Sequence, residues 1–162
     1  MRRRPPLRSV GAVVCAALLL GLAACSETVS LDAPRVTGAE ARACRALVQT
    51  LPDQVADQPR REVDAGEGFG AAWGDPAIEL RCGVPTPTGF DRFAACQVTN
   101  GVGWYIPESQ TQGRRVDIVM TTVGRALNVE VRIPAEYFPP AAAMVDLAPA
   151  VKKAVREVQP CV

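Results

Sequence analysis

The cysteines constrain this chain more than any other residue type. The sequence of 162 residues contains six cysteines and no histidine. The absence of histidine excludes imidazole-based nucleophilic triads, and no C-x-x-C pair is present to form a thiolate metal site. We therefore expect no metal site and no cofactor. We also expect the cysteines to pair with one another if the chain folds outside the reducing cytosol.

The first 24 residues have the organisation of an export signal. Four arginines lie among the first eight residues, and an apolar run then extends from Val10 to Leu20. A membrane-spanning helix needs about 20 apolar residues, more than this run supplies. A basic start followed by a short apolar run is typical of a signal peptide. We therefore predict that residues 1–24 are a cleaved signal peptide.

The tetrapeptide Leu22–Cys25 follows the apolar run directly and resembles the lipobox of bacterial lipoprotein precursors. This resemblance implies that the Cys25 thiol receives a diacylglyceryl group and that cleavage before Cys25 makes it the mature N-terminus. Two acyl chains, such as palmitate, suffice for stable membrane attachment. We therefore expect the protein to be a lipoprotein on the extracytoplasmic side of the cell membrane, attached through Cys25.

Residues 25–38 are predicted to be a lipid-anchored tether, because they are polar, lack an apolar period and contain Pro34. An ordered first strand from Thr28 to Leu31 is the alternative. Cleavage would also remove four of the 18 basic residues and none of the 17 acidic residues. A mildly acidic mature chain argues against a nucleic-acid partner.

Apolar periodicity predicts a helix at the start of the folded part. Thr37 and Glu40 have the spacing of a capping box, and Pro52 marks the end of the helix. Cys44 lies on the apolar stripe of this helix. A second helix is predicted near the C-terminus, with Asp146 as its cap and Pro149 in its first turn.

Strands are predicted between the two helices. Period-two alternation indicates strands at residues 78–84, 116–120 and 127–133, and Asn100-Gly101 predicts a hairpin within residues 96–106. The glycine-rich segment 66–76 is predicted to be a loop. The short connections favour an antiparallel sheet of about four to five strands, with the N-terminal and C-terminal helices packed on one face. We predict one α+β domain over residues 39–162.

Four cysteines remain in the mature domain, and we predict two disulfides among them. Cys44 and Cys82 both lie on predicted apolar faces, so we favour a 44–82 bond, which leaves Cys96 for Cys161. The rival pairing joins 82 to 96 and 44 to 161. Sequence alone does not fix the connectivity.

Several motifs of the mature chain look familiar. They are Cys44–Leu47 with Leu51–Pro52, Ala72–Pro85, Asn100–Trp104 and Thr121–Arg125. Over about residues 40–158, the chain resembles an actinobacterial family of small secreted or lipid-anchored proteins, domain-of-unknown-function family 3515. That family has no assigned activity, so the resemblance implies only the compartment and the single-domain organisation.

The sequence offers little for catalysis. Ser109 lies in a polar loop and has only lysines as conceivable bases. The carboxylates considered for a glycosidase-like pair are Asp75, Glu79, Asp117, Glu130 and Glu136. Three of these lie on polar strand faces, where charges usually meet water. We therefore predict no catalytic residues and expect a non-catalytic binding or scaffolding protein, with a carboxylate-dependent cell-envelope hydrolase as the alternative.

Aromatic residues suggest where a partner would bind. Trp73 lies in the glycine-rich segment, and Trp104 and Tyr105 are neighbours at the predicted hairpin, where only one of them can enter the core. The hypothesis is that Trp73 and the outward aromatic residue contact an envelope protein or a cell-wall component. The alternative is that both tryptophans fill the core.

Overall fold

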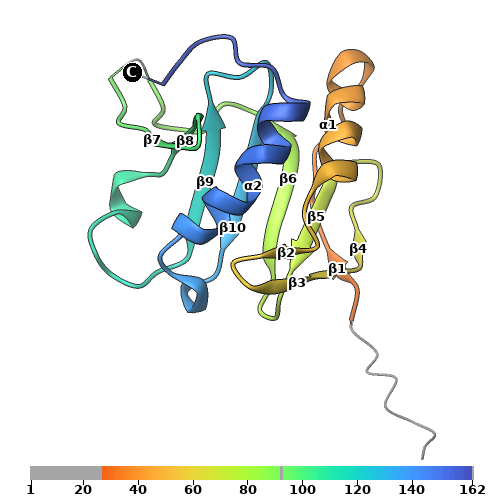
Figure 1. Ribbon diagram of the computed structural model, residues 1–162, viewed down its shortest axis with the longest axis horizontal. Helices are drawn as coiled ribbons and strands as arrows, with labels where there is room; N and C mark the ends of the chain where they lie inside the picture. The colour runs from red at the N-terminus through yellow and green to blue at the C-terminus, as the bar shows by residue number, and fades with distance from the viewer. Residues whose placement is uncertain (1–26, 92, 162) are drawn as a thin grey trace, which may run out of the picture.

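An eight-stranded antiparallel sheet with two α-helices in front of it forms the fold (Figure 1). The computed structural model describes residues 27–91 and 93–161. In spatial order, the strands are β2 (Gln54–Val55), β3 (Gln58–Arg61), β5 (Gly70–Trp73), β6 (Ile78–Val84), β10 (Asn128–Ile133), β9 (Ile118–Val123), β8 (Val102–Tyr105) and β7 (Gln97–Thr99). The chain leaves β6 for the far edge and returns through β8 and β9, so that β10 pairs with β6.

The remaining elements lie around this sheet. They are a two-stranded parallel sheet of β1 (Val29–Ser30) and β4 (Val63–Asp64), the helices α1 (Gly38–Thr50) and α2 (Ala141–Ala154), and the 3₁₀ turns η1 (Glu108–Gln110) and η2 (Ala135–Tyr137). Helix α1 contacts β6 and α2, and α2 contacts β2, β7 and β8. The mixed α+β class and the antiparallel sheet are confirmed.

The predicted number of four to five strands is wrong. Three of the additional strands, β2, β3 and β5, come from the segment between α1 and β6, where the sequence predicts irregular chain and a loop. All four residues of β5 are buried, so this strand has no apolar–polar alternation to reveal it. Its pairing with β3 and β6 overrides the low strand propensity of Gly70.

The helix placement also differs from the prediction. Helix α2 begins at Ala141, after Pro140, and not at Asp146, so Pro149 lies in its interior. Asp146 lies inside the helix and does not cap it. Its carboxylate instead accepts a hydrogen bond of 2.8 Å from the amide of Ala56 in the β2–β3 turn. Thr37 precedes α1 as predicted, but its side chain makes no capping hydrogen bond.

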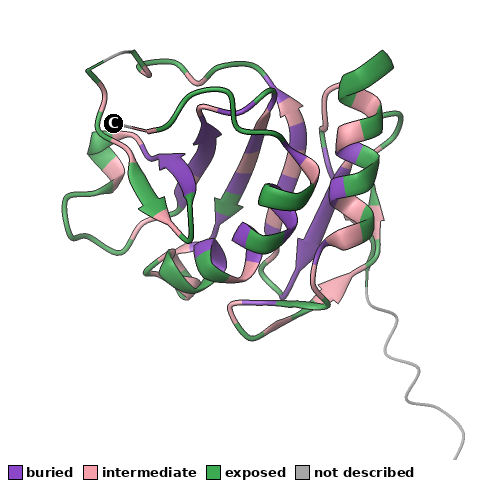
Figure 2. Ribbon diagram, turned by 45° about the horizontal axis from the view of Figure 1, so that its top comes forward, coloured by how far each residue is buried: buried purple, intermediate pink, exposed green. Residues whose placement is uncertain are grey.

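The core lies between the sheet and the helices. Burial alternates along the central strands β6 and β10, which Figure 2 shows as bands of purple between pink and green. The apolar residues of β6 and β10 that alternate along each strand, such as Leu80 and Val131, belong to one core cluster with Leu47 of α1 and Leu147 of α2. The residues between them point to the other side of the sheet, here called the opposite face.

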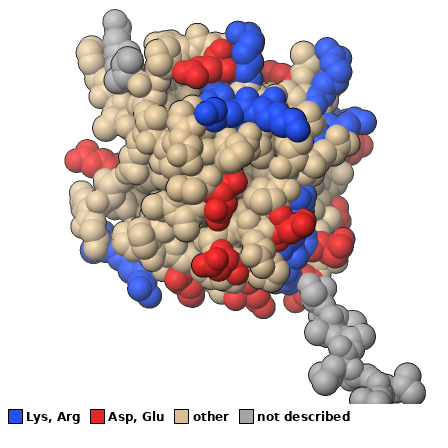
Figure 3. Space-filling view, in the orientation of Figure 1, with Lys and Arg blue, Asp and Glu red and all other residues tan. Residues whose placement is uncertain are grey.

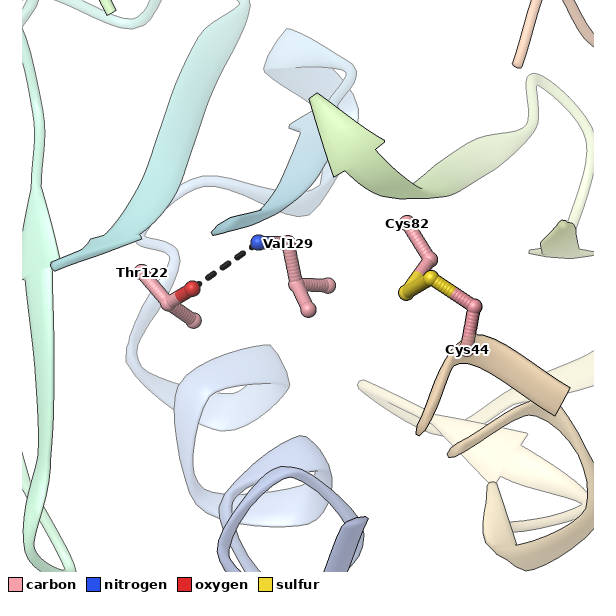
Figure 4. The surroundings of a disulfide bond; sticks show 4 residues. All are labelled: Cys44, Cys82, Thr122 and Val129. Atoms are coloured by element: carbon pink, nitrogen blue, oxygen red, sulfur yellow. Dashed lines mark hydrogen bonds between the residues drawn. A yellow bond between two sulfur atoms is a disulfide. The ribbon is translucent and has the colours of Figure 1, made fainter. Parts of the chain in front are cut away.

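Both disulfides follow the pairing favoured from the sequence. Cys44–Cys82 joins α1 to β6, with 5.6 Å between the Cα atoms, and both cysteines are fully buried (Figure 4). Cys96–Cys161 joins the start of β7 to the C-terminal tail, with 6.3 Å between the Cα atoms. Both separations lie in the usual range for a disulfide. The rival pairing of 82 with 96 is wrong.

The segment 27–36, here called the N-terminal strap, packs along the sheet. The sequence predicts a tether over residues 25–38, yet β1 pairs with β4 and Leu31 is buried. The strap covers the β5–β6 side of the opposite face, where a Cβ on Gly70 would lie 2.7 Å from Leu31. Glycine at this position therefore makes room for the strap.

Candidate functional site

The predicted lipidation site, Cys25, lies outside the described residues, as does the predicted signal peptide. Among residues 27–91 and 93–161, no helix is long and apolar enough to cross a membrane. The same residues hold no cluster of three or more cysteine and carboxylate side chains arranged to bind a metal ion.

The two tryptophans do not form a binding surface. Trp73 and Trp104 are both fully buried, so the hypothesis of a partner-facing Trp73 is wrong and the core alternative holds. The indole of Trp73 donates a hydrogen bond of 3.0 Å to the carbonyl of Pro52, and Arg60 lies over its ring. The glycine-rich segment that carries Trp73 is strand β5 in part, which explains why the residue points inward.

Trp104 and Tyr105 do point to different sides of β8, but both are buried. Trp104 is opposite Thr122 on the core side, and Tyr105 is opposite Thr121 on the opposite face. Tyr105 is only 8% exposed, because the β6–β7 loop covers it and places Phe90 edge-on to its ring at 5.3 Å between centroids. The prediction that the outward aromatic residue would be free for a partner is therefore wrong.

A surface hollow next to Tyr105 is lined in part by aromatic side chains of the β6–β7 loop and β8. The hollow has a volume of about 530 Å³ and is lined by residues that include Phe93, Cys96, Tyr105 and Glu108, and we call it the aromatic hollow. Phe93 is 85% exposed at its rim, more than the other large apolar side chains that reach the surface in residues 27–91 and 93–161, such as Val98 at 59%. The Cys96–Cys161 disulfide fixes the loop at this point.

The sequence analysis missed Phe93. The residue lies in a segment with no periodic pattern, so the only signal available was a second phenylalanine three residues after Phe90. Large apolar side chains this exposed are often part of an interaction site when they border a concave surface.

The carboxylates considered for catalysis fall into two groups. Glu79, Glu130 and Asp117 lie on the opposite face in three neighbouring chain segments, whereas Asp75 and Glu136 are exposed in turns. Ser109 is exposed in η1. The structure therefore brings together three of the five carboxylates.

Each carboxylate in this row has an arginine beside it. Arg81 pairs with Glu130, Arg132 pairs with Asp117 at 2.9 Å between Nη2 and Oδ2, and Arg132 is also opposite Glu79 in the strand register. We call these five residues the charged ladder. Opposite charges facing one another across strands stabilise the sheet modestly.

The protonation of the ladder does not resemble that of a glycosidase. The hydrogen bond from Arg132, and then the one from the amide of Ala135, lower the pKa of the Asp117 carboxyl below its ordinary value of 3.8. The hydrogen bond that Arg132 donates to Asp117 raises the pKa of Arg132 in turn. A general acid requires the reverse, a carboxyl whose pKa is raised toward neutrality. The charged ladder is therefore arranged as a set of ion pairs.

Arg125 is a buried arginine that the sequence analysis also missed. Its guanidinium donates to the carbonyls of Val155 at 2.7 Å and Gly101 at 2.8 Å, which ties the end of α2 to the β7–β8 hairpin. Burial lowers its pKa, against the opposing effect of Glu157. Its contacts are internal to the fold, so Arg125 is a structural residue.

The comparisons with known proteins give a family but no activity. No curated protein and no solved structure matches the chain significantly. The family model described as "Protein of unknown function (DUF3515)" matches residues 6–160, which is nearly the whole chain. The match spans α1, the complete sheet, α2 and the Cys44–Cys82 disulfide, and it ends one residue before Cys161. The chain therefore belongs to the DUF3515 family.

Proposed function

We propose that this protein is a non-catalytic lipoprotein of the cell envelope, attached through a lipid on Cys25 to the extracytoplasmic side of the cell membrane. Its domain binds or scaffolds an envelope protein or a cell-wall component. The proposal includes neither a nucleic-acid partner nor a cofactor.

The pair of disulfides is the main support for the proposed extracytoplasmic location. The bonds close separations of 38 and 65 residues, so together they connect α1 and the C-terminal tail to the sheet region. Disulfides of this structural kind form and persist in oxidising compartments. This supports export, and the lipobox at Leu22–Cys25 supplies the means of retention at the membrane.

Acyl labelling tests the anchor. Replacing Cys25 by alanine should abolish incorporation of labelled palmitate and leave the precursor uncleaved. Cys15→Ala is a matched control, because Cys15 lies within the apolar run and outside the tetrapeptide. Labelling that persists in Cys25→Ala, or that disappears equally in Cys15→Ala, would contradict attachment through Cys25.

The aromatic hollow is the binding surface that we propose. Its support is the exposed ring of Phe93 beside a concave surface with both apolar and polar lining. Rings of this kind stack on sugars or pack against apolar side chains. The surrounding carboxylate of Glu108 and amide of Gln97 provide hydrogen-bonding partners for a polar ligand.

Binding can be separated from folding at this surface. Phe93→Ala should lower retention of the mature protein on isolated cell-wall sacculi, or crosslinking to one identified envelope protein, by at least tenfold. Its melting temperature should stay unchanged, because Phe93 is 85% exposed. Val145→Ala is the control, since Val145 is an exposed apolar residue of α2 at 47%. Equal retention of both variants would eliminate the hollow as the binding surface.

The arrangement of the charged ladder does not favour the alternative of a carboxylate-dependent hydrolase. A retaining or inverting glycosidase needs one protonated and one ionised carboxyl on either side of a substrate. Here Glu130 and Asp117 are each engaged by an arginine. Turnover of cell-wall glycan that is lost in Glu130→Gln would overturn this preference.

A further inference from the structure

The N-terminal strap is fixed to the sheet from its first described residue. Arg61 donates a hydrogen bond of 2.7 Å to the carbonyl of Glu27 and another of 2.8 Å to the carbonyl of Gly74 in the β5–β6 turn. The amide of Val29 donates to Glu62 at 2.9 Å, and the amide of Leu31 donates to Asp64 at 2.8 Å. Main-chain hydrogen bonds thus hold the strap beside β4, and the Arg61 side chain links it to β3.

The later part of the strap is equally engaged. Arg81 donates to the carbonyl of Asp32 at 3.1 Å, and Arg35 forms an ion pair with Glu67. Three glycines, at positions 68, 70 and 83, lie where a Cβ would collide with Ala33, Leu31 and Val36 respectively. The sheet therefore carries a track shaped for this segment, and the strap cannot act as a free spacer.

This docking leaves very little chain between the fold and the proposed lipid. Ser26 is the single residue between Cys25 and Glu27. An extended chain advances about 3.3–3.6 Å per residue, so Glu27 can lie at most about 7 Å from Cys25. A lipid on Cys25 would thus fix the fold within one or two residue lengths of the headgroups.

We propose that the domain lies directly against the membrane, with the end of the sheet formed by Glu27, Arg61 and the β5–β6 turn facing the lipid surface. This inference rests on the proposed lipid anchor at Cys25. Under this proposal the domain does not move freely on a tether. It has a defined orientation, with one end of the sheet nearest to the membrane.

The charge at this end of the sheet indicates that the acyl chains, and not attraction to anionic headgroups, attach the domain to the membrane. In Figure 3, acidic side chains are more frequent than basic ones along the lower border, where Figure 1 places β1, β2 and β3. Anionic lipid would not attract such a surface. The two lysines Lys152 and Lys153 lie in the last turn of α2, on the upper part of the molecule. The anchor, and not electrostatic attraction, therefore sets the orientation.

The two tryptophans can report the orientation, because they lie at different distances from the end of the sheet that is proposed to face the membrane. Trp73 is opposite Arg60 in the strand register, next to Arg61, whose side chain binds the carbonyl of Glu27, whereas Trp104 lies on β8. Trp73 is opposite Ile78, at the start of β6 next to the β5–β6 turn. Trp104 is opposite Thr122, whose hydroxyl accepts from the amide of Val129, and Val129 is opposite Cys82, four residues farther along β6. At ~3.3 Å per residue, Trp104 therefore lies about 13 Å farther along the strands from the proposed membrane-facing end. Because the chain has two tryptophans, Trp104→Phe leaves Trp73 as the only donor, and Trp73→Phe leaves Trp104.

The test uses the lipidated full-length mature protein in phosphatidylcholine–phosphatidylglycerol vesicles that contain dansyl-labelled lipid. Energy transfer to the headgroups should be at least twofold more efficient from Trp73 than from Trp104. Inserting ten Gly/Ser residues between Ser26 and Glu27 adds a flexible span of about 17 Å. In the chain with both tryptophans, this insertion should reduce transfer by at least half. The same ten residues added after Val162 are the control and should change nothing.

Each outcome decides one part of the proposal. A protein that floats with the vesicles but shows equal transfer from both tryptophans, or no response to the insertion, is anchored without the proposed orientation. A protein that does not float and carries no acyl label contradicts the anchor at Cys25, and the orientation with it. The insertion experiment needs no core substitution, so it remains decisive if a Trp→Phe variant fails to fold.

Discussion

The two faces of the large sheet are covered in different ways. On the core side, regular helices pack on apolar strand residues, and the Cys44–Cys82 disulfide is fully buried among them. On the opposite face, the charged ladder occupies the centre. Irregular chain covers the rest, with the N-terminal strap over β5 and β6 and the β6–β7 loop and C-terminal tail over β8.

The second disulfide belongs to this irregular cover. A Cβ on Gly103 would lie 2.6 Å from the Cβ of Cys161, so the tail passes directly over β8. Cys96 and Cys161 are both half-buried. The comparison shows that helices stabilise one face by burial, whereas the other face depends on hydrogen bonds, glycines and a cross-link to hold chain that has no periodic structure of its own.

The largest effect is expected on the core side. Trp73→Ala should lower the free energy of unfolding by about 3–5 kcal/mol, because it removes a fully buried indole and leaves the carbonyl of Pro52 without its donor. Urea unfolding measures this change. Comparing Trp73→Phe with Trp104→Phe isolates the contribution of the indole hydrogen bond. The indole nitrogen of Trp104 has no hydrogen-bond partner within the described residues, so Trp104→Phe should cost much less than Trp73→Phe.

The two disulfides test the comparison between the two faces of the sheet, because one belongs to each face. Loop closure alone favours the longer Cys96–Cys161 loop slightly, by about 0.5 kcal/mol. Burial acts in the other direction, since Cys44 and Cys82 are fully buried and removal of their sulfurs leaves a cavity. We expect a loss of about 4–5 kcal/mol for Cys44→Ala with Cys82→Ala, against about 2–3 kcal/mol for Cys96→Ala with Cys161→Ala. Thermal unfolding under oxidising conditions compares them, and the reverse order would refute the burial argument.

The strap gives an intermediate effect. Leu31→Ala should cost about 2–3 kcal/mol in unfolding free energy, because the side chain is 5% exposed and packs against Gly70. A tether would give no change. Ser30→Ala, at an exposed position of the same strap, is the control and should stay within about 0.5 kcal/mol.

The smallest effect is expected in the charged ladder. Asp117 contributes stability as a carboxylate, because its pKa is lowered in the folded state by the hydrogen bonds from Arg132 and Ala135. That contribution is complete above the unfolded value of 3.8 and is lost as the pH falls through the lower folded value. Asp117→Asn should therefore be slightly less stable than the natural protein at neutral pH. The difference should shrink in acid-unfolding curves below that pH, and a difference that grows there would contradict the assignment.

The periodic parts of the fold could be predicted from the sequence. Alternation places β6 at residues 78–84 as predicted, and the hairpin turn forms at Asn100 and Gly101, both with positive φ. The apolar stripe that contains Cys44 and the alternation that contains Cys82 also favour the disulfide that the structure has. These features are local, because a helix or a half-buried strand repeats its pattern within a few residues.

Only the tertiary structure decided what lies on the opposite face. The N-terminal strap, strand β5 and the cover over Tyr105 depend on partners distant in the chain, such as Arg61 for Glu27 and Phe90 for Tyr105. Strand β5 is buried on both sides and the strap is irregular, so neither has a repeating pattern in the sequence. The sequence by itself determined the elements that bury one side. Contacts between distant segments determined which surfaces remained open, because burial of irregular chain depends on the whole fold and not on local periodicity.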